Sequence, residues 1–154
     1  MPISDSVTPP AWKQPGTYIL ILEMEVDHSV QIGRLGTFDL RAGWYAYVGS
    51  AFGSGGLRGR LNHHLTPPVR PHWHIDYLRA AATVREVWTV ASPTPYEHRW
   101  ASGLGSLLGA HLPIPRFGAS DCRCAAHLVH FTEHPLLAAF QALSPTVHIT
   151  DWRP

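Results

Sequence analysis

The stretch Gly43–His64, GWYAYVGSAFGSGGLRGRLNHH, joins three local patterns and decides how the rest of the chain is interpreted. Residues 43–50 alternate like a strand, which places Tyr45 and Tyr47 on one face and smaller or apolar side chains on the other. A loop with four glycines follows, and Gly56–Leu65 then predicts a short helix with two leucines on its buried face. The stretch therefore predicts a strand, a tight turn and a helix that packs back on the sheet.

The glycine-rich loop itself does not match the known phosphate-cradling motifs. No Gly-Lys-Ser or Gly-Lys-Thr closes it, so it is not a P-loop. A dinucleotide fingerprint requires a parallel βαβ unit, and the surrounding segments predict antiparallel strands. The simplest interpretation of the glycines is a flexible turn that feeds the start of a helix.

Outward from this stretch, the chain predicts an α+β fold with a small antiparallel sheet flanked by helices. Gly16–Val26 is an apolar run typical of a central strand, and Val30–Leu40 predicts a second strand kinked at its glycines. With residues 43–50 these form an antiparallel meander of about three core strands, plus an extra hairpin or edge strand. Further along, the patterns predict a helix at His72–Ala81, a strand at Thr83–Ser92, a longer helix at Pro93–Leu112, a loop and short strand at Arg116–Thr132, and a helix at His134–Ser144.

Length and composition predict one globular domain. The 154 residues are 45% hydrophobic, which is enough for a core, and residues 16–154 are expected to form a single domain after a flexible lead-in at 1–15. The formal net charge is +1, which argues against broad non-specific binding of nucleic acid but leaves room for a local basic patch. Arginine carries nearly all the positive charge, and arginine recognises phosphate in a bidentate manner.

The sequence also gives expectations about location. The first residues lack a cationic segment followed by an apolar run, so no signal peptide is predicted, and no apolar run reaches about 18 residues. The two cysteines, Cys122 and Cys124, are too close in sequence for an easy mutual disulfide. We expect a cytoplasmic protein with reduced thiols and no association with a membrane.

The helix after the glycine loop carries a candidate phosphodiester site. Arg60, His63 and His64 lie three and four residues apart, so they line one helix face near the strand with Tyr45 and Tyr47. An arginine would hold phosphate oxygens, and a tyrosine or histidine would move the proton of an attacking water. Each of these side chains also has a structural alternative, as a core aromatic or as a packing or surface arginine.

Taken together, the motifs resemble the GIY-YIG nuclease superfamily. The matching segments are GTYIL, GRLG, GWYAYVGSAFGSGGLRGRLNHH, HWHIDYL and FGASDCRCAAHL, which extend from Gly16 to about Phe131. More narrowly, the chain resembles an uncharacterised branch whose members occur alone or appended to endonuclease III-type DNA glycosylases. The resemblance implies a three-stranded antiparallel sheet flanked by helices, and metal-dependent cleavage of a DNA phosphodiester.

The resemblance also implies site residues. Tyr18 matches the tyrosine of the first motif, Tyr47 that of the second, and Arg60 the arginine of the following helix. His64 falls where some members carry a histidine, and Glu97 matches the single carboxylate that holds one Mg²⁺ or Mn²⁺ ion. In such a site a tyrosine orients or deprotonates water, the arginine stabilises the pentavalent phosphate, and the ion stabilises the leaving oxygen.

Several features depart from the superfamily pattern. Thr17 replaces the isoleucine of the first motif, and a longer segment separates the two motifs, which indicates an elongated hairpin or an inserted strand. Asp76 in HWHIDYL is a competing carboxylate for the metal. The alternative for Glu97 is a helix-start carboxylate that favours the helix dipole.

A second group of candidate metal ligands lies near the end of the chain. Cys122, Cys124 and His127 offer zinc-binding atoms, although C-x-C is tighter than the usual C-x₂-C spacing. The sequence does not identify a fourth ligand; Asp121 or one of the eleven histidines could supply it. The alternative is that Asp121 fixes a loop while the cysteines fill core space.

Three functional hypotheses follow. The first is a divalent-metal-dependent DNA endonuclease with a role in DNA repair or processing and a DNA-repair protein as a partner. The second is a catalytically impaired module of the same fold that binds nucleic acid or protein. The third is an interaction domain stabilised by a structural zinc. The sequence leaves open the nucleic-acid substrate, the metal and the oligomeric state.

Overall fold

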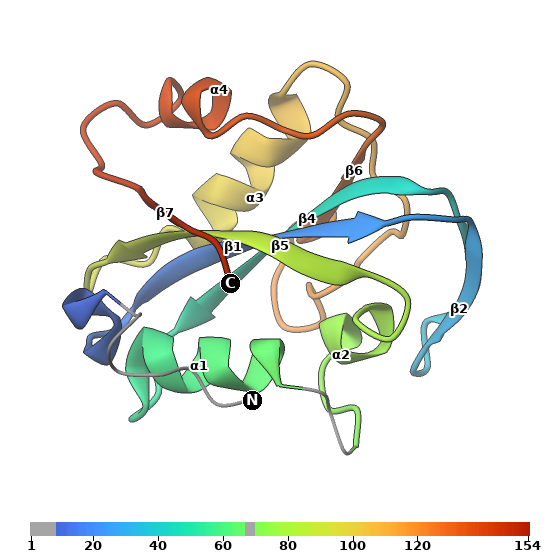
Figure 1. Cartoon of the computed structure of the whole chain (residues 1–154), viewed down its shortest axis with the longest axis horizontal. Helices are drawn as coiled ribbons and strands as arrows, with labels where there is room; N and C mark the ends of the chain where they lie inside the picture. Colours follow the sequence, from blue (N-terminus) through green and yellow to red (C-terminus); the bar gives the residue numbers. More distant parts are fainter. Residues whose placement is uncertain (1–8, 67–69) are drawn as a thin grey trace.

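The protein is built around one antiparallel sheet with helices on both of its faces (Figure 1). The computed structural model describes residues 9–66 and 70–154. Five strands are ordered β6-β4-β1-β5-β7, and each pair of neighbours is antiparallel. A separate two-stranded sheet pairs β2 with β3. The predicted α+β class with a small antiparallel sheet flanked by helices is therefore confirmed.

The elements have the following bounds. The strands of the large sheet are β1 (Gly16–Met24), β4 (Gly43–Ala51), β5 (Thr83–Ala91), β6 (Leu128–Phe131) and β7 (Thr150–Trp152), and the hairpin consists of β2 (His28–Ile32) and β3 (Gly36–Leu40). The helices are η1 (Pro10–Lys13), α1 (Gly56–Leu65), α2 (His74–Leu78), α3 (Glu97–Ser106) and α4 (Leu137–Gln141). Among the described residues, no helix is long and apolar enough to cross a membrane.

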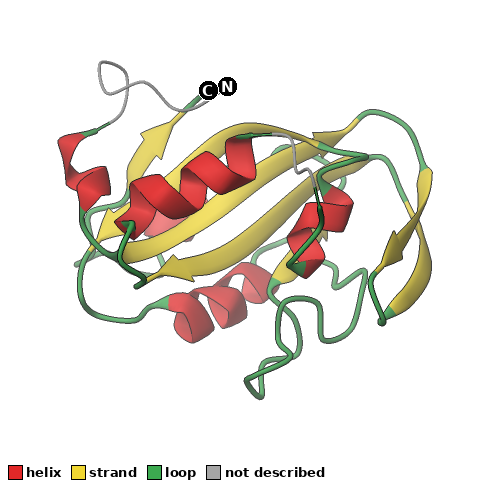
Figure 2. Ribbon diagram, turned by 90° about the horizontal axis from the view of Figure 1, so that it is seen from below, coloured by secondary structure: helices red, strands yellow, loops and turns green. Residues whose placement is uncertain are grey.

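β1 is the middle strand because both of its faces are buried. Tyr18 and Leu20 point into one hydrophobic cluster, and Ile19 and Ile21 point into a second cluster on the opposite face. A continuous apolar run is typical of a strand covered on both sides. The first cluster includes α1, α2 and the hairpin, while the second includes α3 and α4. Figure 2 shows α1 lying across the sheet on one of these faces.

The two tyrosine motifs, which belong to the first and third predicted strands, lie side by side in the sheet. β1 pairs with β4 along its whole length, and Tyr18 stands opposite Gly49. The segment predicted as one kinked strand, Val30–Leu40, is corrected by the structure: it is most of the β2–β3 hairpin. Gly33 and Gly36 adopt positive φ angles of 48° and 122°, so the chain reverses where a kink was expected. The meander is thus interrupted by an inserted hairpin.

The second half of the predicted flexible lead-in is also corrected. Pro10–Lys13 form a short 3-10 helix, and Trp12 is only 1% exposed. The indole Nε1 of Trp12 donates to Thr89 Oγ1 over 3.3 Å, and its ring meets that of Trp152 at 5.0 Å. No periodic pattern marks this short helix in the sequence, because a single buried side chain, that of Trp12, anchors it. The rest of the predicted lead-in, residues 1–8, lies outside the described residues.

The later elements are shorter than predicted, and one strand was missed. α2 begins only after Trp73, because the Asp76 carboxylate accepts hydrogen bonds from the backbone N–H groups of His72 and Trp73. α3 covers Glu97–Ser106 and not Pro93–Leu112, since the chain is extended at Leu107, just past the end of the helix. β7 has three residues at a sheet edge, a length that gives no readable alternation.

Candidate active site and neighbouring thiol cluster

A pocket opens where the end of β4 meets α1, the start of α3 and the loop before β6. Its volume is about 620 Å³. Three of the predicted site residues line it: Tyr47, Arg60 and Glu97. The rest of the wall is made by Gly49, Ser50, Phe52, Gly53, His72, Trp73, His74, His98, Gly118, Ser120 and Asp121. The pocket thus contains side chains from both sides of the sheet, because α1 and α3 cover opposite faces.

Tyr18 and His64, the other two residues predicted as catalytic, lie together behind the pocket wall. The Tyr18 hydroxyl and His64 Nε2 share a hydrogen bond of 2.6 Å, and both side chains are buried. The Tyr47 ring lies against His64 with a centroid distance of 6.2 Å. Gly49 leaves the space that Tyr18 occupies, since a Cβ at that position would come within 2.4 Å of the Tyr18 hydroxyl oxygen.

Burial keeps both tyrosines and His64 neutral. Desolvation raises the pKa of Tyr18 well above its ordinary value, and the neighbouring Tyr47 adds to this while Arg60 opposes it. Desolvation also raises the pKa of Tyr47, again with Arg60 in opposition. The pKa of His64 is lowered to about 3 by burial and by the positive charge of Arg79. The pair therefore consists of a phenol and an uncharged imidazole at neutral pH.

Arg60 is held at the pocket by an aromatic ring. Its guanidinium carbon lies 4.4 Å from the centre of the Trp73 ring, which is a cation–π contact. Trp73 precedes α2, so the arginine of one helix rests on the entry to the next. Arg60 also lines the pocket, so the edge of its guanidinium plane can donate hydrogen bonds to an anion there.

Glu97, the first residue of α3, reaches the pocket from the opposite face of the sheet. Its Oε2 accepts a 3.0 Å hydrogen bond from Ser50 Oγ, and its Oε1 lies 3.2 Å from His127 Nδ1. Burial by itself would raise the pKa of Glu97, but the contacts with His127 and Ser50 outweigh it and the pKa is lowered. The side chain is 24% exposed, so an ionised carboxylate faces the pocket.

Asp76, the competing carboxylate, does not line the pocket. Its side chain is fully buried and receives the two backbone N–H groups that begin α2. It also lies 3.1 Å from His63 Nε2 and 3.5 Å from an Arg79 nitrogen. These partners give Asp76 a structural role at the α2 terminus. The second carboxylate at the pocket is Asp121, which the sequence suggested as a loop-fixing residue or as a fourth zinc ligand.

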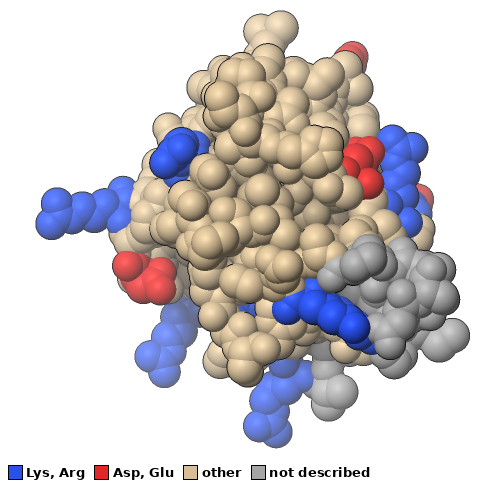
Figure 3. Space-filling model, turned by 90° about the vertical axis from the view of Figure 1, so that its left-hand side faces the viewer, with Lys and Arg blue, Asp and Glu red and all other residues tan. Residues whose placement is uncertain are grey.

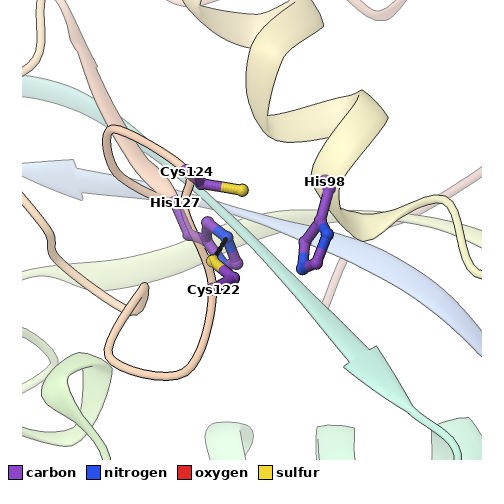
Figure 4. A group of neighbouring side chains, drawn as sticks. All are labelled: His98, Cys122, Cys124 and His127. Atoms are coloured by element: carbon purple, nitrogen blue, oxygen red, sulfur yellow. Dashed lines mark hydrogen bonds between the residues drawn. The ribbon is translucent and has the colours of Figure 1, made fainter.

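The predicted cysteine and histidine ligands form one cluster beside the pocket, and the structure adds a fourth member (Figure 4). One potential ligand atom from each of His98, Cys122, Cys124 and His127 lies within 4.8 Å of the others. His98 comes from α3, directly after Glu97, while the other three come from the loop before β6. Burial and the adjacent Cys122 raise the pKa of Cys124 to about 11. His98 could not be singled out in a chain with eleven histidines, because only the fold brings α3 to this loop.

Basic side chains are spread out on the face of the molecule drawn in Figure 3. On this face the blue lysine and arginine side chains project separately, and red acidic side chains lie near some of them. This distribution agrees with the formal net charge of +1. Any contact with a nucleic-acid backbone on this face would therefore involve individual arginines and not a continuous basic surface.

Comparison with known proteins gives one match. A family model described as "Domain of unknown function DUF123" matches residues 17–148, which is most of the chain. The matched range includes both tyrosine motifs, α1, the start of α3 and the cysteine-containing loop. No curated protein and no solved structure matches.

Proposed function

We propose that this chain, which belongs to the DUF123 family, is a GIY-YIG-type endonuclease that hydrolyses DNA phosphodiesters with the help of one divalent cation. The observation that carries the proposal is the meeting of Tyr47, Arg60 and Glu97 in one open pocket of about 620 Å³. These residues are distant in sequence, and a phosphate-binding cation, a hydroxyl and a metal-binding carboxylate are what such hydrolysis requires.

Arg60 would hold the scissile phosphate. Its cation–π contact with Trp73 restricts the guanidinium before a ligand arrives, which lowers the entropic cost of binding. Charge-assisted N–H···O bonds to two phosphate oxygens would strengthen as negative charge builds up in the transition state. Arg60 would therefore act on the rate of cleavage as well as on DNA affinity.

Glu97 fits a hard divalent cation such as Mg²⁺ or Mn²⁺, because its ionised oxygens face the pocket and Asp121 lines the same pocket. Mg²⁺ is commonly held by one or two carboxylates with several waters retained. When bound, the ion would lower the pKa of a water and neutralise the leaving oxygen. Ser50 and His127 would keep the Glu97 carboxylate in position through the contacts that they already make.

Tyr47 would orient the attacking water, and Tyr18 would support the site from behind the pocket wall. Tyr47 lines the pocket, and its hydroxyl is protonated at neutral pH. Tyr18 shares its hydroxyl hydrogen bond with a neutral His64, whose ring can accept or donate a proton on that side. Arg60 also interacts with Tyr18, so the phenol lies between a proton acceptor and the proposed phosphate-binding group. Because the pKa of Tyr18 is raised and that of His64 is lowered, this pair would hold Arg60 and Tyr47 in place and would not act as the general base.

Nicking of supercoiled plasmid with Mg²⁺ or Mn²⁺ tests the proposal. We expect Arg60→Ala and Glu97→Gln each to lower the cleavage rate by about 10²- to 10³-fold, the range found for a single transition-state-stabilising group. Arg85→Ala and Glu25→Gln are matched controls, since Arg85 pairs with Glu23 and Glu25 away from the pocket. Both controls should cleave like the unmodified chain.

The same assay separates the alternatives. Duplex, branched, flap and damaged DNA should be compared, because relatives of this branch are appended to glycosylases and a repair-related substrate is part of the proposal. Binding without cleavage on every substrate, with no loss in Glu97→Gln, would instead favour a catalytically impaired module that binds nucleic acid or protein. Cleavage that persists in both pocket variants would exclude this pocket as the site.

A further inference from the structure

The cluster beside the pocket has the composition of a tetrahedral metal site. His98, Cys122, Cys124 and His127 offer two sulfur and two nitrogen atoms that lie within 4.8 Å of one another. Bond lengths of about 2.0 to 2.3 Å in a tetrahedron place ligand atoms about 3.3 to 3.8 Å apart, so small side-chain movements would close this group around one ion. The Cys122 sulfur and His127 Nε2 are already 3.4 Å apart.

The backbone of the cysteine loop is held so that both thiols face the same side. The Arg116 guanidinium donates to the carbonyl oxygens of Ala119, Cys122 and Cys124, with distances of 2.6 Å to the two cysteine carbonyls. Arg116 itself adopts a left-handed φ of 67°, which turns the chain around its own side chain. Despite the tight C-x-C spacing, the side chains of both cysteines lie in one group with His98 and His127, as Figure 4 shows.

His127 links this cluster to the pocket. Its Nε2 faces the Cys122 sulfur, and its Nδ1 lies 3.2 Å from Glu97 Oε1. A histidine that binds a metal through one ring nitrogen commonly donates its other N–H to a carboxylate, which fixes the ring and the tautomer. The buried Nδ1 makes no hydrogen bond among the described residues, and the Glu97 carboxylate lies within ion-pair distance of it.

We propose that His98, Cys122, Cys124 and His127 form a structural Zn²⁺ site whose ligand His127 positions the Glu97 carboxylate. Two thiolates and two imidazoles suit zinc and disfavour Mg²⁺, which prefers oxygen ligands. Four protein ligands close the coordination sphere, so this ion holds the loop and α3 together and is separate from the cation at Glu97. Zinc binding stands without the nuclease proposal, whereas the positioning of Glu97 for catalysis rests on it.

Metal content of the purified protein tests the site directly. Under reducing conditions we expect about one zinc per chain, and less than about 0.2 in Cys122→Ser and in His98→Ala. His98→Cys keeps a ligand at the same position and should keep zinc. His111→Ala is a matched control, because His111 is an exposed histidine of the same α3–β6 connection outside the cluster.

Cobalt replaces zinc as a spectroscopic probe that needs no enzymatic activity. The Co²⁺ form should show tetrahedral d–d bands and thiolate-to-cobalt charge transfer, both lost in Cys122→Ser. Absence of zinc from the reconstituted protein, or a cobalt spectrum without thiolate bands, would overturn the proposal. So would metal that stays bound in Cys122→Ser and His98→Ala, since it would then lie elsewhere.

The link to Glu97 has its own measurement. In His127→Cys, which retains a metal ligand but not the imidazole, zinc content should stay near that of the unmodified chain. The Mn²⁺ concentration needed for half-maximal cleavage should rise by about 10- to 100-fold, the usual effect of losing such an outer partner. Unchanged Mn²⁺ dependence would refute the positioning role. If the unmodified chain binds zinc and neither it nor any variant cleaves DNA, the zinc site is supported and the nuclease proposal is refuted.

Discussion

Two buried tyrosines on neighbouring strands differ in what their hydroxyl groups contact. Tyr18 in β1 bonds to His64 behind the pocket, whereas Tyr45 in β4 donates to the Arg41 carbonyl oxygen over 2.6 Å. Both rings belong to the same hydrophobic cluster. Comparing variants of the two tyrosines therefore distinguishes the effect of losing a buried hydroxyl group from the effect of losing a residue of the proposed site.

Tyr18→Phe should lower both stability and the proposed cleavage. Removing the hydroxyl leaves His64 Nε2 buried without its partner, which costs about 1–3 kcal/mol of unfolding free energy. Since Tyr18 would hold Arg60 in place for the proposed reaction, the cleavage rate should also fall, by up to about 10²-fold. Urea denaturation and plasmid nicking measure the two effects. Tyr45→Phe should show a stability cost with unchanged cleavage; equal cleavage loss in both variants would argue against a specific role of Tyr18.

His64 should make stability depend on pH below neutrality. Its folded pKa of about 3 lies below its ordinary value of 6.5, so the unfolded chain binds this proton more readily. The stabilisation is complete above pH 6.5 and is lost as the pH falls toward 3, with a slope of at most about 1.4 kcal/mol per pH unit.

Denaturation between pH 7 and pH 5 measures this effect. His64→Gln keeps a hydrogen-bonding group near Tyr18 but does not titrate, so its stability should fall less over this range. His74, whose pKa burial also lowers, contributes in both proteins and cancels in the comparison. Identical pH profiles would show that the pKa of His64 does not differ between the folded and unfolded chains.

At the scale of elements, the glycines around α1 have opposite roles. Gly56 starts the helix with a φ of 62°, and a Cβ there would meet the Lys13 and Gln14 carbonyl oxygens at 2.7 Å. Gly59 lies inside the same helix, and a Cβ there would have no neighbour within 4 Å. One glycine is therefore required by the packing of η1 on α1, while the other only weakens the helix.

Gly59→Ala should stabilise the protein by about 0.5–1 kcal/mol, since alanine restricts the unfolded chain and favours helix. Gly56→Ala should destabilise it by roughly 1–3 kcal/mol, because the left-handed angle and the carbonyl contacts both oppose a side chain. Thermal or urea denaturation distinguishes these signs. A stabilised Gly56→Ala variant would contradict the described start of α1.

At the scale of the whole molecule, the N-terminal segment closes the edge of the sheet. Trp12 packs against Trp152 of β7 and bonds to Thr89 of β5, so it joins the beginning and the end of the described chain. Trp12→Ala should cost about 3–5 kcal/mol of unfolding free energy, the usual range for a buried tryptophan. Lys13→Ala, at an exposed neighbouring position, is the control and should change little. Equal stabilities in denaturant would show that η1 is dispensable.

The candidate pocket also exists only at this scale, because its walls come from opposite layers. Tyr47 and Arg60 belong to the α1 side of the sheet, while Glu97 starts a helix that covers the other side. The pocket forms at the end of β4, where both layers reach past the strand. The pocket would be lost if either layer shifted relative to the sheet.

The sequence by itself determined the elements with strong local patterns. The β1 run, the alternation of β4, the bounds of α1 and the strand at β5 were readable because period and burial agree over nine or ten residues. The alternation also gave the shared face of Tyr45 and Tyr47. The local signal weakened for short or irregular elements, which explains the reading of Val30–Leu40 as one kinked strand, the missed β7 and the overlong α3.

Only the tertiary structure decided which side chains meet. Trp12 and His98 have no pattern in the chain that marks them, since each acts through a partner at least 24 residues away. The separation of Asp76 from the pocket and the entry of Asp121 into it depend on where α2 begins and how the loop before β6 folds. Local periodicity determines which face of a strand or helix a side chain occupies. Long-range packing determines how far apart those faces lie. The pocket and the thiol cluster depend on these distances.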